Sequence, residues 1–472
     1  MKIKKEPKLV FINIENTEEH IAPILGFCYI AAFLKEKLHY GNIKQVNLVY
    51  AEEGLEGGIL HENPDIVGFR TITAHIYLIN KLSKCLKEKH GIPVIYGGPH
   101  ITALPNDLPP YVDLAVIGEG EQTMLELMRL FLKKSRFLTK DLVNVKGISF
   151  WNKEGVYFTG HRELIRNLDD LPMPDYSICD DRCFTPKERW LWLDSPVRGI
   201  PYMASRGCAY RCFFCQPSHF EGFLRRQSID KTFHDLSLIR KRYNVELIAF
   251  YDPIFASNAK ELQEFYLMAM ERDWLQSCFF YMQFFSRNFD EDMAKILSKI
   301  MAYRIYFGFE SGSERILRLL KNNKVSLEDN KKVSSLAEKY DLRIDTCFMI
   351  GVPGETEDDL MKTEDYIRNE YLNYVQIAHT VPQPGTPLWD HCLDRGLLPE
   401  PIDWNMMEPK PHDSDEDLIY INTGLKKEIY LEYNRRMRRL ADDRTEKGKI
   451  VVKKRFDKDL DSVRKKCQDI LL

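Results

Sequence analysis

The run Ser205-Arg-Gly-Cys-Ala-Tyr-Arg-Cys-Phe-Phe-Cys-Gln-Pro217 decides how this chain is interpreted. Its three cysteines, Cys208, Cys212 and Cys215, have the spacing C-x3-C-x2-C and follow the short apolar stretch Pro201-Tyr-Met-Ala. Three thiolates on one tight loop can ligate three irons of a [4Fe–4S] cube, because iron–sulfur clusters are held by cysteine thiolates. The fourth iron would then have no ligand from this loop and could bind a small molecule.

Two plainer interpretations of the triad stay open at this point. A structural zinc site needs four ligands, and His219 is near enough in sequence to complete a Cys3His set. Alternatively, the three thiols are ordinary buried cysteines, like the other eight, which are scattered along the sequence. A disulfide framework is not expected, because eleven cysteines is an odd number and Met1-Lys-Ile-Lys-Lys is not a signal peptide. The cysteines therefore predict a reducing, cytoplasmic compartment.

Length and charge limit the remaining classes. At 472 residues the chain is long enough for about two to four domains. A formal net charge of -3 gives no electrostatic reason to expect a nucleic-acid partner. No apolar run reaches the ~18 residues that a membrane span requires, so we expect no membrane partner.

The first third of the sequence alternates short apolar runs with segments of helical period. Continuous apolar strands separated by helices are typical of a parallel sheet covered on both faces. Five such units predict a flavodoxin-like α/β sheet, whose ligands lie beyond the carboxyl ends of the strands. The expected strands are Leu9–Ile14, Val46–Tyr50, Asp65–Phe69, Pro93–Gly98 and Asp113–Gly118, and the expected helices are 23–38, 77–89 and 121–133.

Small and polar residues follow the last three of these strands. Glycine lets a backbone approach a ligand closely, and hydroxyl groups are compact hydrogen-bonding partners. One such loop could consist of turn residues alone, but three at one sheet edge fit a ligand site as well as they fit turns. No G-x-G-x-x-G follows the first strand, so a dinucleotide is not indicated. The candidate residues are Thr71, Thr73, Gly97, Gly98, Gly118, Glu119 and Gly120.

A second series of strands begins after a connector. Residues 145–160 predict a hairpin, and Leu168-Asp-Asp-Leu-Pro-Met-Pro reads as an extended linker. Six strand candidates, each followed by a helix, predict an open, partial (β/α)6 barrel with its functional loops at the carboxyl ends of the strands. These strands begin near Pro201, Glu246, Phe279, Arg304, Arg343 and Tyr374.

Polar residues and glycines end the strands of this second series. Each has a plain alternative: Asp252 could cap a helix, Glu310 could pair with a lysine, and Gly351 could serve a turn. Their number on one rim is hard to explain by packing alone. The set also includes Arg287 and Val352.

Together these strings resemble the cobalamin-dependent radical S-adenosylmethionine (SAM) enzymes over roughly residues 5 to 390. Ala22-Pro-Ile-Leu-Gly-Phe-Cys-Tyr-Ile, Gly97-Gly-Pro-His and Val116-Ile-Gly-Glu-Gly-Glu are similar to that family's cobalamin-binding domain. The cysteine loop, Gly308-Phe-Glu-Ser-Gly-Ser-Glu and Met349-Ile-Gly-Val-Pro-Gly-Glu-Thr are similar to its barrel. The resemblance implies a cobalamin domain over 1–140, a linker over 141–195, a radical SAM barrel over 196–390 and a helical segment over 391–472.

The resemblance also assigns roles to the candidate residues. Cys208, Cys212 and Cys215 would hold a [4Fe–4S] cluster whose open iron chelates SAM. Phe214 would lie against adenine, with Gly351 and Val352 offering backbone nearby. Glu310, Arg287 and Asp252 would be polar contacts to SAM, and the three loops of the first domain would hold cobalamin. The D-x-H-x-x-G motif is missing, with Glu18-Glu-His20 as the nearest string, so cobalamin would be bound base-off without a protein histidine.

The implied activity is carbon methylation. A 5′-deoxyadenosyl radical would activate a carbon of a small-molecule or peptide substrate, methylcobalamin would supply the methyl group, and a flavodoxin or ferredoxin would supply electrons. Alternatives are a radical rearrangement or oxidative cyclisation without methyl transfer, and a plain radical SAM enzyme with a degenerate cobalamin domain. A methylthiotransferase is disfavoured, because the first third contains only Cys28 and Cys85. A non-catalytic cobalamin sensor is disfavoured by the intact cysteine triad.

Overall fold

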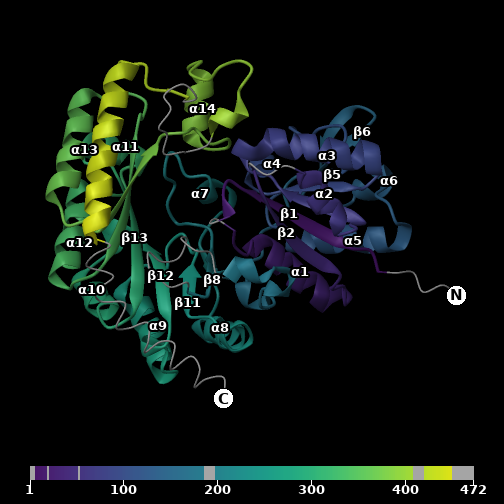
Figure 1. Cartoon of the computed structure of the whole chain (residues 1–472), viewed down its shortest axis with the longest axis horizontal. Helices are drawn as coiled ribbons and strands as arrows, with labels where there is room; N and C mark the ends of the chain where they lie inside the picture. The colour runs from purple at the N-terminus through teal and green to yellow at the C-terminus, as the bar shows by residue number, and fades with distance from the viewer. Residues whose placement is uncertain (1–5, 19–20, 51–53, 185–196, 408–418, 449–472) are drawn as a thin grey trace. The chain divides into compact units, whose positions relative to one another are not determined.

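The computed structural model describes residues 6–18, 21–50, 54–184, 197–407 and 419–448. These residues form two compact units (Figure 1). The first comprises the described residues before position 190 together with His219–Gly222 and Asp403–Asn405, and the second comprises the others.

The first unit contains a seven-stranded sheet with the order β2-β1-β3-β4-β5-β6-β7. Strands β1 to β5 are all parallel, and their order 2-1-3-4-5 is that of flavodoxin. The predicted flavodoxin-like α/β fold is therefore confirmed. The parallel strands are β1 Leu9–Glu15, β2 Ile43–Val49, β3 Ile66–Arg70, β4 Val94–Gly97 and β5 Leu114–Val116.

The predicted hairpin is formed by β6 (Ile148–Asn152) and β7 (Gly155–Phe158). Strand β6 pairs antiparallel with β5, and β7 pairs antiparallel with β6. The hairpin thus extends the first sheet at its β5 edge. An unpaired edge strand offers free backbone groups, and the hairpin satisfies those of β5.

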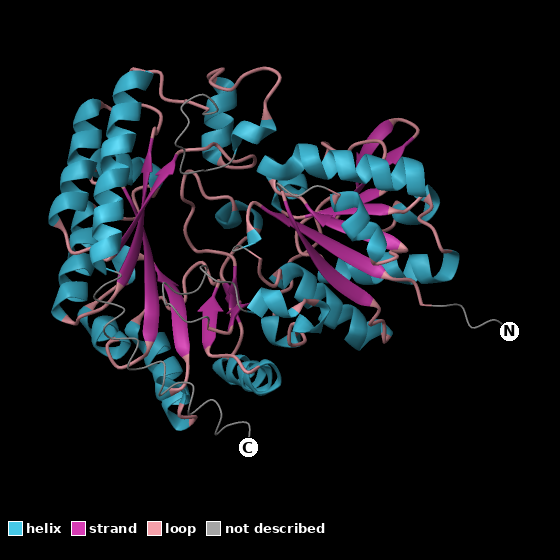
Figure 2. Ribbon diagram, in the orientation of Figure 1, coloured by secondary structure: helices cyan, strands magenta, loops and turns pink. Residues whose placement is uncertain are grey.

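Helices cover both faces of this sheet (Figure 2). Helices α1 (Leu25–Leu38) and α5 (Glu121–Lys134) pack against each other, and α2 (Leu55–His61) packs against α3 (Ile76–His90). The strands supply Val10, Ile12 and Val67 to one buried core. Sequence periodicity predicted α1, α3 and α5 but missed the short helices α2, α4 (Pro99–Ala103) and α6 (Thr139–Leu142), which have too few turns to show a period.

The second unit contains a six-stranded sheet with the order β15-β14-β13-β12-β11-β8. Every neighbouring pair is parallel, so the strands follow one another in chain order from one edge to the other. This open sheet confirms the predicted partial barrel. Its strands are β8 Gly199–Tyr202, β11 Leu247–Phe250, β12 Phe279–Phe284, β13 Ala302–Glu310, β14 Ile344–Ile350 and β15 Tyr374–His379.

The helices of the second unit lie on the outer side of this sheet (Figure 1). A last helix runs through residues 427–448 and lies beside α13, which confirms the helical carboxy-terminal segment. Among the residues described, no helix combines the length and the apolar character needed to cross a membrane. The outer helices are α8 Ile229–Tyr243, α9 Ala259–Glu271, α10 Glu291–Leu297, α11 Glu314–Leu320, α12 Leu327–Lys339 and α13 Glu357–Asn369. Helix α14 (Pro387–Asp394) lies apart from them, and its Leu388 amide donates to the Phe213 carbonyl of the cysteine loop at 3.0 Å.

Candidate functional site

The cysteine loop follows β8 and is fixed by contacts on both sides. The Tyr210 ring stacks on Phe285 with 3.6 Å between ring centroids, and its hydroxyl donates to Asn288 Oδ1 at 3.1 Å. The Phe213 amide donates to the Leu320 carbonyl at 2.9 Å. The loop is therefore held against the end of β12 and the end of α11, at the carboxyl edge of the sheet.

The three thiols are too widely spaced for a single metal ion. Cys208, Cys212 and Cys215 belong to one packed cluster, in which Cys212 is buried and the other two are partly exposed. Within the described residues, they are not among the ligand sets whose atoms all lie within 4.8 Å of one another. Such closeness is what one tetrahedral zinc ion requires. The three thiols as placed therefore do not form a compact site for one metal ion.

The other described cysteines are free thiols, and three of them gather in the first unit. Cys28 Sγ lies 3.9 Å from Cys179 Sγ, and Asn47 Nδ2 donates to Cys183 Sγ at 3.2 Å. The sequence gives no sign of this, since the three positions are spread from α1 to the segment after the hairpin. The hydrogen bond with Cys179 is the largest cause that raises the pKa of Cys183, and burial adds to it. The hydrogen bond with Cys183 lowers the pKa of Cys179, but the hydrogen bond with Cys28 and burial outweigh it, so the pKa of Cys179 is raised as well. Both groups are therefore neutral thiols at physiological pH.

Phe214 and Val352 come together as the adenine-contact prediction requires. Val352 is fully buried in a small apolar cluster with Ile316 and Met349, and Phe214 packs against that cluster. Phe214 comes from the cysteine loop and Val352 from the loop after β14. Two strands that lie apart in the sequence thus bring an aromatic ring and an apolar surface to one place.

Glu310 forms a buried ion pair with Lys321. From the sequence we expected only that Glu310 could pair with some lysine. Its Oε1 lies 2.7 Å from Lys321 Nζ, and both side chains are less than a tenth exposed. Lys321 Nζ also lies 5.7 Å from the centre of the Phe214 ring and 5.6 Å from that of Phe285. An ammonium over aromatic faces is favourable. This places a cation beside the cysteine loop.

Lys321 was missed as a site residue. It ends the apolar helix α11, eleven positions after Glu310, and a single lysine at a helix end has no distinctive sequence pattern. Burial lowers the pKa of the Lys321 ammonium, but the neighbouring Glu310 carboxylate outweighs this, so its pKa is raised and it stays charged. Burial raises the pKa of Cys212 to about 11, while Lys321 opposes that shift.

The backbone near Glu310 is shaped for this pair. The register of β13 against β14 shifts between Gly308 and Glu310, and Glu310 has a φ of 60°. A Cβ at Gly308 would overlap the Glu310 carboxylate and would lie 3.0 Å from Lys321 Nζ. Bulges and left-handed non-glycine residues cluster at functional sites. Gly308 is therefore needed so that the carboxylate can lie over the strand.

Asp252 and Arg287 occupy different surroundings. Asp252 is fully buried, and its carboxylate accepts from Ser205 Oγ at 2.5 Å and from the Ala204 amide at 3.2 Å. Burial raises the pKa of Asp252 to about 6. Asp252 thus ties the end of β11 to the strand that leads into the cysteine loop. Arg287 is exposed, in the 3-10 turn Ser286–Asn288 after β12.

The glycine loop after β14 is held by a buried carboxyl group. Glu355 Oε2 accepts from the Gly351 amide at 2.7 Å and from the Val352 amide at 3.4 Å. Burial raises the pKa of Glu355 to about 8, so the group is protonated at neutral pH. Gly351 has a φ of 81°, and a Cβ there would lie 3.2 Å from both His379 and Tyr430. The sequence analysis did not single out Glu355.

The carboxy-terminal segment supports the same loop. His379, at the end of β15, is buried, with Nδ1 2.7 Å from the Tyr430 hydroxyl and Nε2 2.6 Å from the Ile419 carbonyl. Because a carbonyl only accepts, Nε2 carries the proton and Nδ1 accepts from Tyr430. Asn422 Nδ2 donates to the Glu355 carbonyl at 2.7 Å. The segment therefore braces the loop that contains Gly351 and Val352.

The candidate cobalamin residues share one edge of the first sheet, and two of them, Thr71 and Gly97, bond to each other. Thr71 Oγ1 donates to the Gly97 carbonyl at 2.8 Å, and the Thr71 amide donates to the same oxygen at 2.6 Å. Thr73 Oγ1 lies 3.2 Å from Nδ1 of the buried His100, whose Nε2 lies 3.1 Å from Asp107 Oδ2. The loops after β3 and β4 thus form one rigid unit.

The glycines of this edge differ in what surrounds them. A Cβ at Gly98, whose φ is 102°, would lie 3.0 Å from the Thr71 carbonyl, and one at Gly120 would lie 2.8 Å from Ile30 Cδ1. Gly118, with a φ of 78°, has open space around its Cβ position. Glu119 accepts from the Ile165 amide at 2.7 Å and so anchors the connector. His20 lies outside the described residues.

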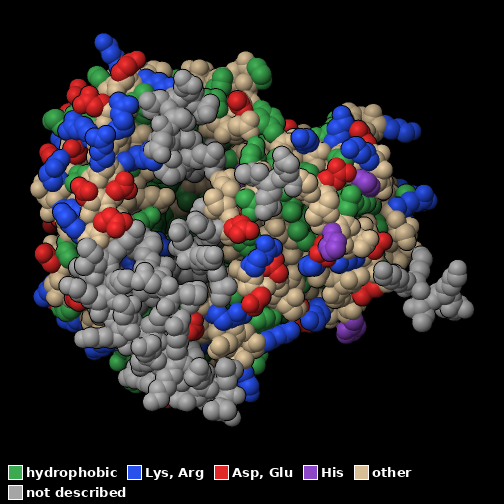
Figure 3. Space-filling view, viewed as in Figure 1, with side chains coloured by type: hydrophobic (Ala, Val, Ile, Leu, Met, Phe, Trp, Pro, Cys, Tyr) green, Lys and Arg blue, Asp and Glu red, His purple; other side chains and the backbone are tan. Residues whose placement is uncertain are grey.

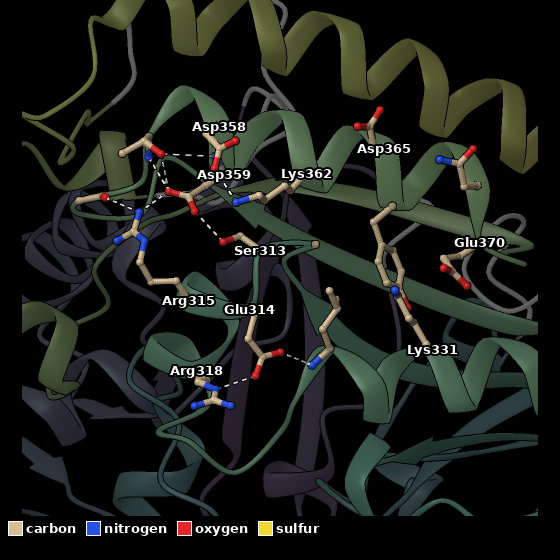
Figure 4. Close-up of a pocket in the computed structure, with 16 residues that line it drawn as sticks. Ser313, Glu314, Arg315, Arg318, Lys331, Asp358, Asp359, Lys362, Asp365 and Glu370 are labelled. Carbon is tan, nitrogen blue, oxygen red and sulfur yellow. Dashed lines mark hydrogen bonds and ion pairs between the residues drawn. The ribbon is translucent and has the colours of Figure 1, made fainter.

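A large polar pocket lies elsewhere in the second unit, between α11, α12 and α13 (Figure 4). Its volume is about 1070 Å³, and its charged side chains pair with one another, as in Arg318–Glu314 and Lys362–Asp358. None of the predicted site residues lines it. Basic and acidic side chains are also interspersed over the described part of the face in Figure 3.

Comparison with known families divides the chain in the same way as its fold. The family model described as "B12 binding domain" matches residues 16–128, and that of the "Radical SAM superfamily" matches residues 202–367. The first match covers the parallel strands of the first unit. The second begins at the end of β8 and includes the cysteine loop, Glu310 and Val352.

Two curated relatives and one solved structure illustrate the similarity. An uncharacterized methyltransferase of Pyrococcus horikoshii is 29% identical over 392 residues, which is 80% of each chain. The anaerobic magnesium-protoporphyrin IX monomethyl ester cyclase of Rubrivivax gelatinosus is 26% identical over 83% of this chain and 71% of its own.

The solved structure is that of the radical SAM methyltransferase TsrM from Kitasatospora setae, with cobalamin and a [4Fe–4S] cluster bound. It aligns with a TM-score of 0.63 at 16% identity and covers 82% of this chain and 75% of that chain. Both the order of the two domains and the fold agree with the resemblance inferred from the sequence. The chain belongs to the family of cobalamin-dependent radical SAM enzymes, in which a B12-binding domain precedes a radical SAM domain.

Proposed function

We propose that the protein is a cobalamin-dependent radical SAM methyltransferase that methylates an unactivated carbon of a small-molecule or peptide substrate. The observation that carries the proposal is the cysteine loop, whose three thiols lie in one packed cluster beside the buried Glu310–Lys321 pair. When bound, the cluster, SAM and cobalamin supply electron transfer, radical formation and a transferable methyl group.

The residues of the second unit would bind and orient the first cofactors. Cys208, Cys212 and Cys215 would hold the [4Fe–4S] cluster. The ring of Phe214 and the buried side chain of Val352 form an apolar surface suited to a purine, and Glu355 fixes the amides of that loop. Lys321 offers a buried positive charge for a carboxylate, and Glu310 offers a negative charge for an ammonium or a ribose hydroxyl.

Asp252 and Arg287 support the proposal in different ways. Because both oxygens of Asp252 are bonded to Ala204 and Ser205, its role would be to position the cysteine loop. Arg287 is exposed beside that loop and could meet the polar end of SAM from solvent. Neither residue needs to take part in the reaction itself.

The loops of the first unit would hold cobalamin mainly through backbone. Thr71, Thr73, Gly97 and Gly98 form one hydrogen-bonded edge, and the open space at Gly118 allows a flat ring to approach. Glu119 and Gly120 complete the third loop. The corrin would be bound base-off, since the chain lacks the D-x-H-x-x-G motif.

The proposal includes a reducing environment and an external electron donor. All ten described cysteines are free, which fits a reducing, cytoplasmic compartment. A flavodoxin or ferredoxin would supply the electron that the cluster passes to SAM.

The test compares two preparations of the anaerobic enzyme, one with cluster and cobalamin and one with the cluster alone. With a low-potential reductant and SAM, the complete enzyme should form S-adenosylhomocysteine, and the enzyme without corrin should form only 5′-deoxyadenosine. Absence of S-adenosylhomocysteine from the complete enzyme, with authentic substrate present, would overturn methyl transfer.

A second candidate is a radical cyclisation or other redox step without methyl transfer. The similarity to a relative named as a cyclase favours keeping it. The same experiment separates the two, because this reaction consumes SAM to 5′-deoxyadenosine without S-adenosylhomocysteine in either preparation.

A further inference from the structure

Three metal-ligand side chains meet on the outer helices of the first unit. Glu56 lies in α2, whereas Cys85 and His90 lie in α3, and the two helices pack side by side (Figure 1). One carboxylate oxygen, the Cys85 sulfur and one ring nitrogen of His90 all lie within 4.8 Å of one another. It is the only set of this kind among the residues that the structure describes.

This ligand set has the chemistry that zinc prefers. Zinc binds thiolate sulfur, imidazole nitrogen and carboxylate oxygen in a tetrahedral arrangement. Its usual bond lengths place neighbouring ligand atoms about 3.3 to 3.7 Å apart. His90 Nε2 and Glu56 Oε1 are 2.8 Å apart as hydrogen-bonded partners. Side-chain rotations that bring these atoms, now within 4.8 Å of one another, to the zinc spacing would convert the set into three ligands, with water in the fourth position.

The site lies far from the predicted cofactor edge along α3. That helix begins at the carboxyl edge after β3 and runs back antiparallel to the strands, so His90, its last residue, is at the amino edge. The cobalamin loops occupy the opposite edge. The ligand set therefore belongs neither to the cobalamin site nor to the cysteine loop of the second unit.

Helix α2 has few stabilising interactions of its own, so a metal ion shared with α3 would stabilise it. It is only seven residues long, contains Gly57 and Gly58, and has no side-chain cap at Gly54. Each interior glycine costs about 1 kcal/mol of helix stability relative to alanine. Only Leu55 and Ile59 of this helix are buried, and Leu60 packs partly buried against the same core. A metal ion shared with α3 would hold α2 in place.

The charged groups around Glu56, Cys85 and His90 do not prevent a metal ion from binding there. The hydrogen bond between Cys85 and Glu56 is the largest cause that lowers the pKa of the Glu56 carboxyl group, and it is also the largest cause that raises the pKa of the Cys85 thiol. Lys89 Nζ lies 4.0 Å from Glu56 Oε2, but its side chain is 69% exposed and can turn away. A metal ion would take the place of that ammonium and of the thiol proton of Cys85.

We propose that Glu56, Cys85 and His90 form a three-ligand zinc site, completed by water, that fastens α2 to α3. The proposal is independent of the methyltransferase function, because none of these residues belongs to the proposed cofactor loops.

The test uses the complete enzyme, loaded anaerobically with cluster and cobalamin, incubated with a small excess of Zn²⁺ and then desalted. Iron, cobalt and zinc are counted per chain by elemental mass spectrometry, so the cysteine loop is known to be occupied by iron. We expect about one zinc per chain, as a tetrahedral three-ligand site allows. Cys85→Ser and His90→Gln should lower zinc affinity by at least about tenfold in competition with a chromophoric chelator.

Two variants on the same helices serve as matched controls. His61→Gln removes an exposed histidine of α2 outside the ligand set and should leave zinc binding unchanged. Lys89→Ala removes the competing ammonium and should tighten binding. Failure of the wild type to retain zinc would overturn the proposal, and so would equal retention by the wild type and a Cys85→Ser/His90→Gln double variant. Unchanged iron and cobalt contents show that each variant is folded.

Discussion

The candidate cofactor sites at the edges of the two sheets consist of different chemical groups. In the second unit the candidate site consists of side chains: three thiols, Phe214 and the buried Glu310–Lys321 pair. In the first unit the candidate residues are mostly glycines and threonines that bond to one another's backbone, as Thr71 does to Gly97. A site made of charged side chains is sensitive to charge changes, whereas a site made of backbone is sensitive to an added Cβ.

The largest expected effect is the complete loss of function at one cofactor site while the other keeps its cofactor. Cys212→Ala removes one of the three proposed cluster ligands, so we expect the iron content and the cleavage of SAM to fall to background. Corrin uptake by the first unit should remain. Iron counting, corrin absorbance and assay of 5′-deoxyadenosine measure the three quantities. Cys392→Ala, which changes a buried thiol outside the loop, is the control and should keep its iron. Loss of corrin together with iron would contradict separate sites.

The buried ion pair should give the next largest effect. Lys321→Met leaves the Glu310 carboxylate buried without its partner, which typically costs about 3–5 kcal/mol of stability. Adding Glu310→Gln should recover most of that loss. Chemical unfolding followed by the signal of the second unit, together with equilibrium binding of SAM, would measure it. If the two single changes were additive, the carboxylate and the ammonium would not be coupled.

A Cβ added to the first edge should act through backbone strain. Gly98→Ala places a methyl group 3.0 Å from the Thr71 carbonyl at a φ of 102° and should cost about 1–3 kcal/mol, with reduced corrin uptake. Gly118→Ala has a φ of 78° but open space, so it should cost only the left-handed penalty of about 1–2 kcal/mol. Thermal unfolding and corrin titration measure both. Identical losses would argue against a tight Thr71–Gly98 contact.

The smallest effect concerns pH. The pKa of Glu355 is raised by burial to about 8, so below pH 8 the folded protein holds a proton that the unfolded chain releases near pH 4. The folded state therefore binds more protons in this window, and stability falls as pH rises through it. Glu355→Gln mimics the protonated form and should remove that fall, which amounts to up to about 1 kcal/mol between pH 7 and pH 8. Thermal unfolding of the wild type and of Glu355→Gln, measured from pH 7 to pH 8, checks this. If the stability of both proteins changed equally with pH, the assignment would be contradicted.

Much of the fold could be predicted from the sequence because the signals are local. The apolar runs of β1, β3 and β14 and the helical period of α3 and α5 are contained within single elements. The cysteine spacing is equally local, and it predicted the type of site. Helix α2 was missed because its seven residues with two glycines resemble a loop.

Partnerships between distant residues could not be predicted in this way. Lys321 is eleven positions from Glu310, and nothing in the intervening sequence marks the two as a pair. The brace formed by His379 and Tyr430 joins a strand end to a helix 51 positions later. Such contacts depend on how elements pack, which no single segment encodes.

By itself, the sequence determined the family and the order of the two domains and predicted three cluster ligands, because each is carried by a short run of residues with fixed spacing. Only the tertiary structure decided which side chains surround those ligands. It placed Lys321 over Phe214, turned Asp252 toward the strand before the cysteine loop, and brought Glu56 to Cys85 and His90. The physical reason is that desolvation and charge pairing act on neighbours in space, and parallel βα units make neighbours of residues that the chain keeps far apart.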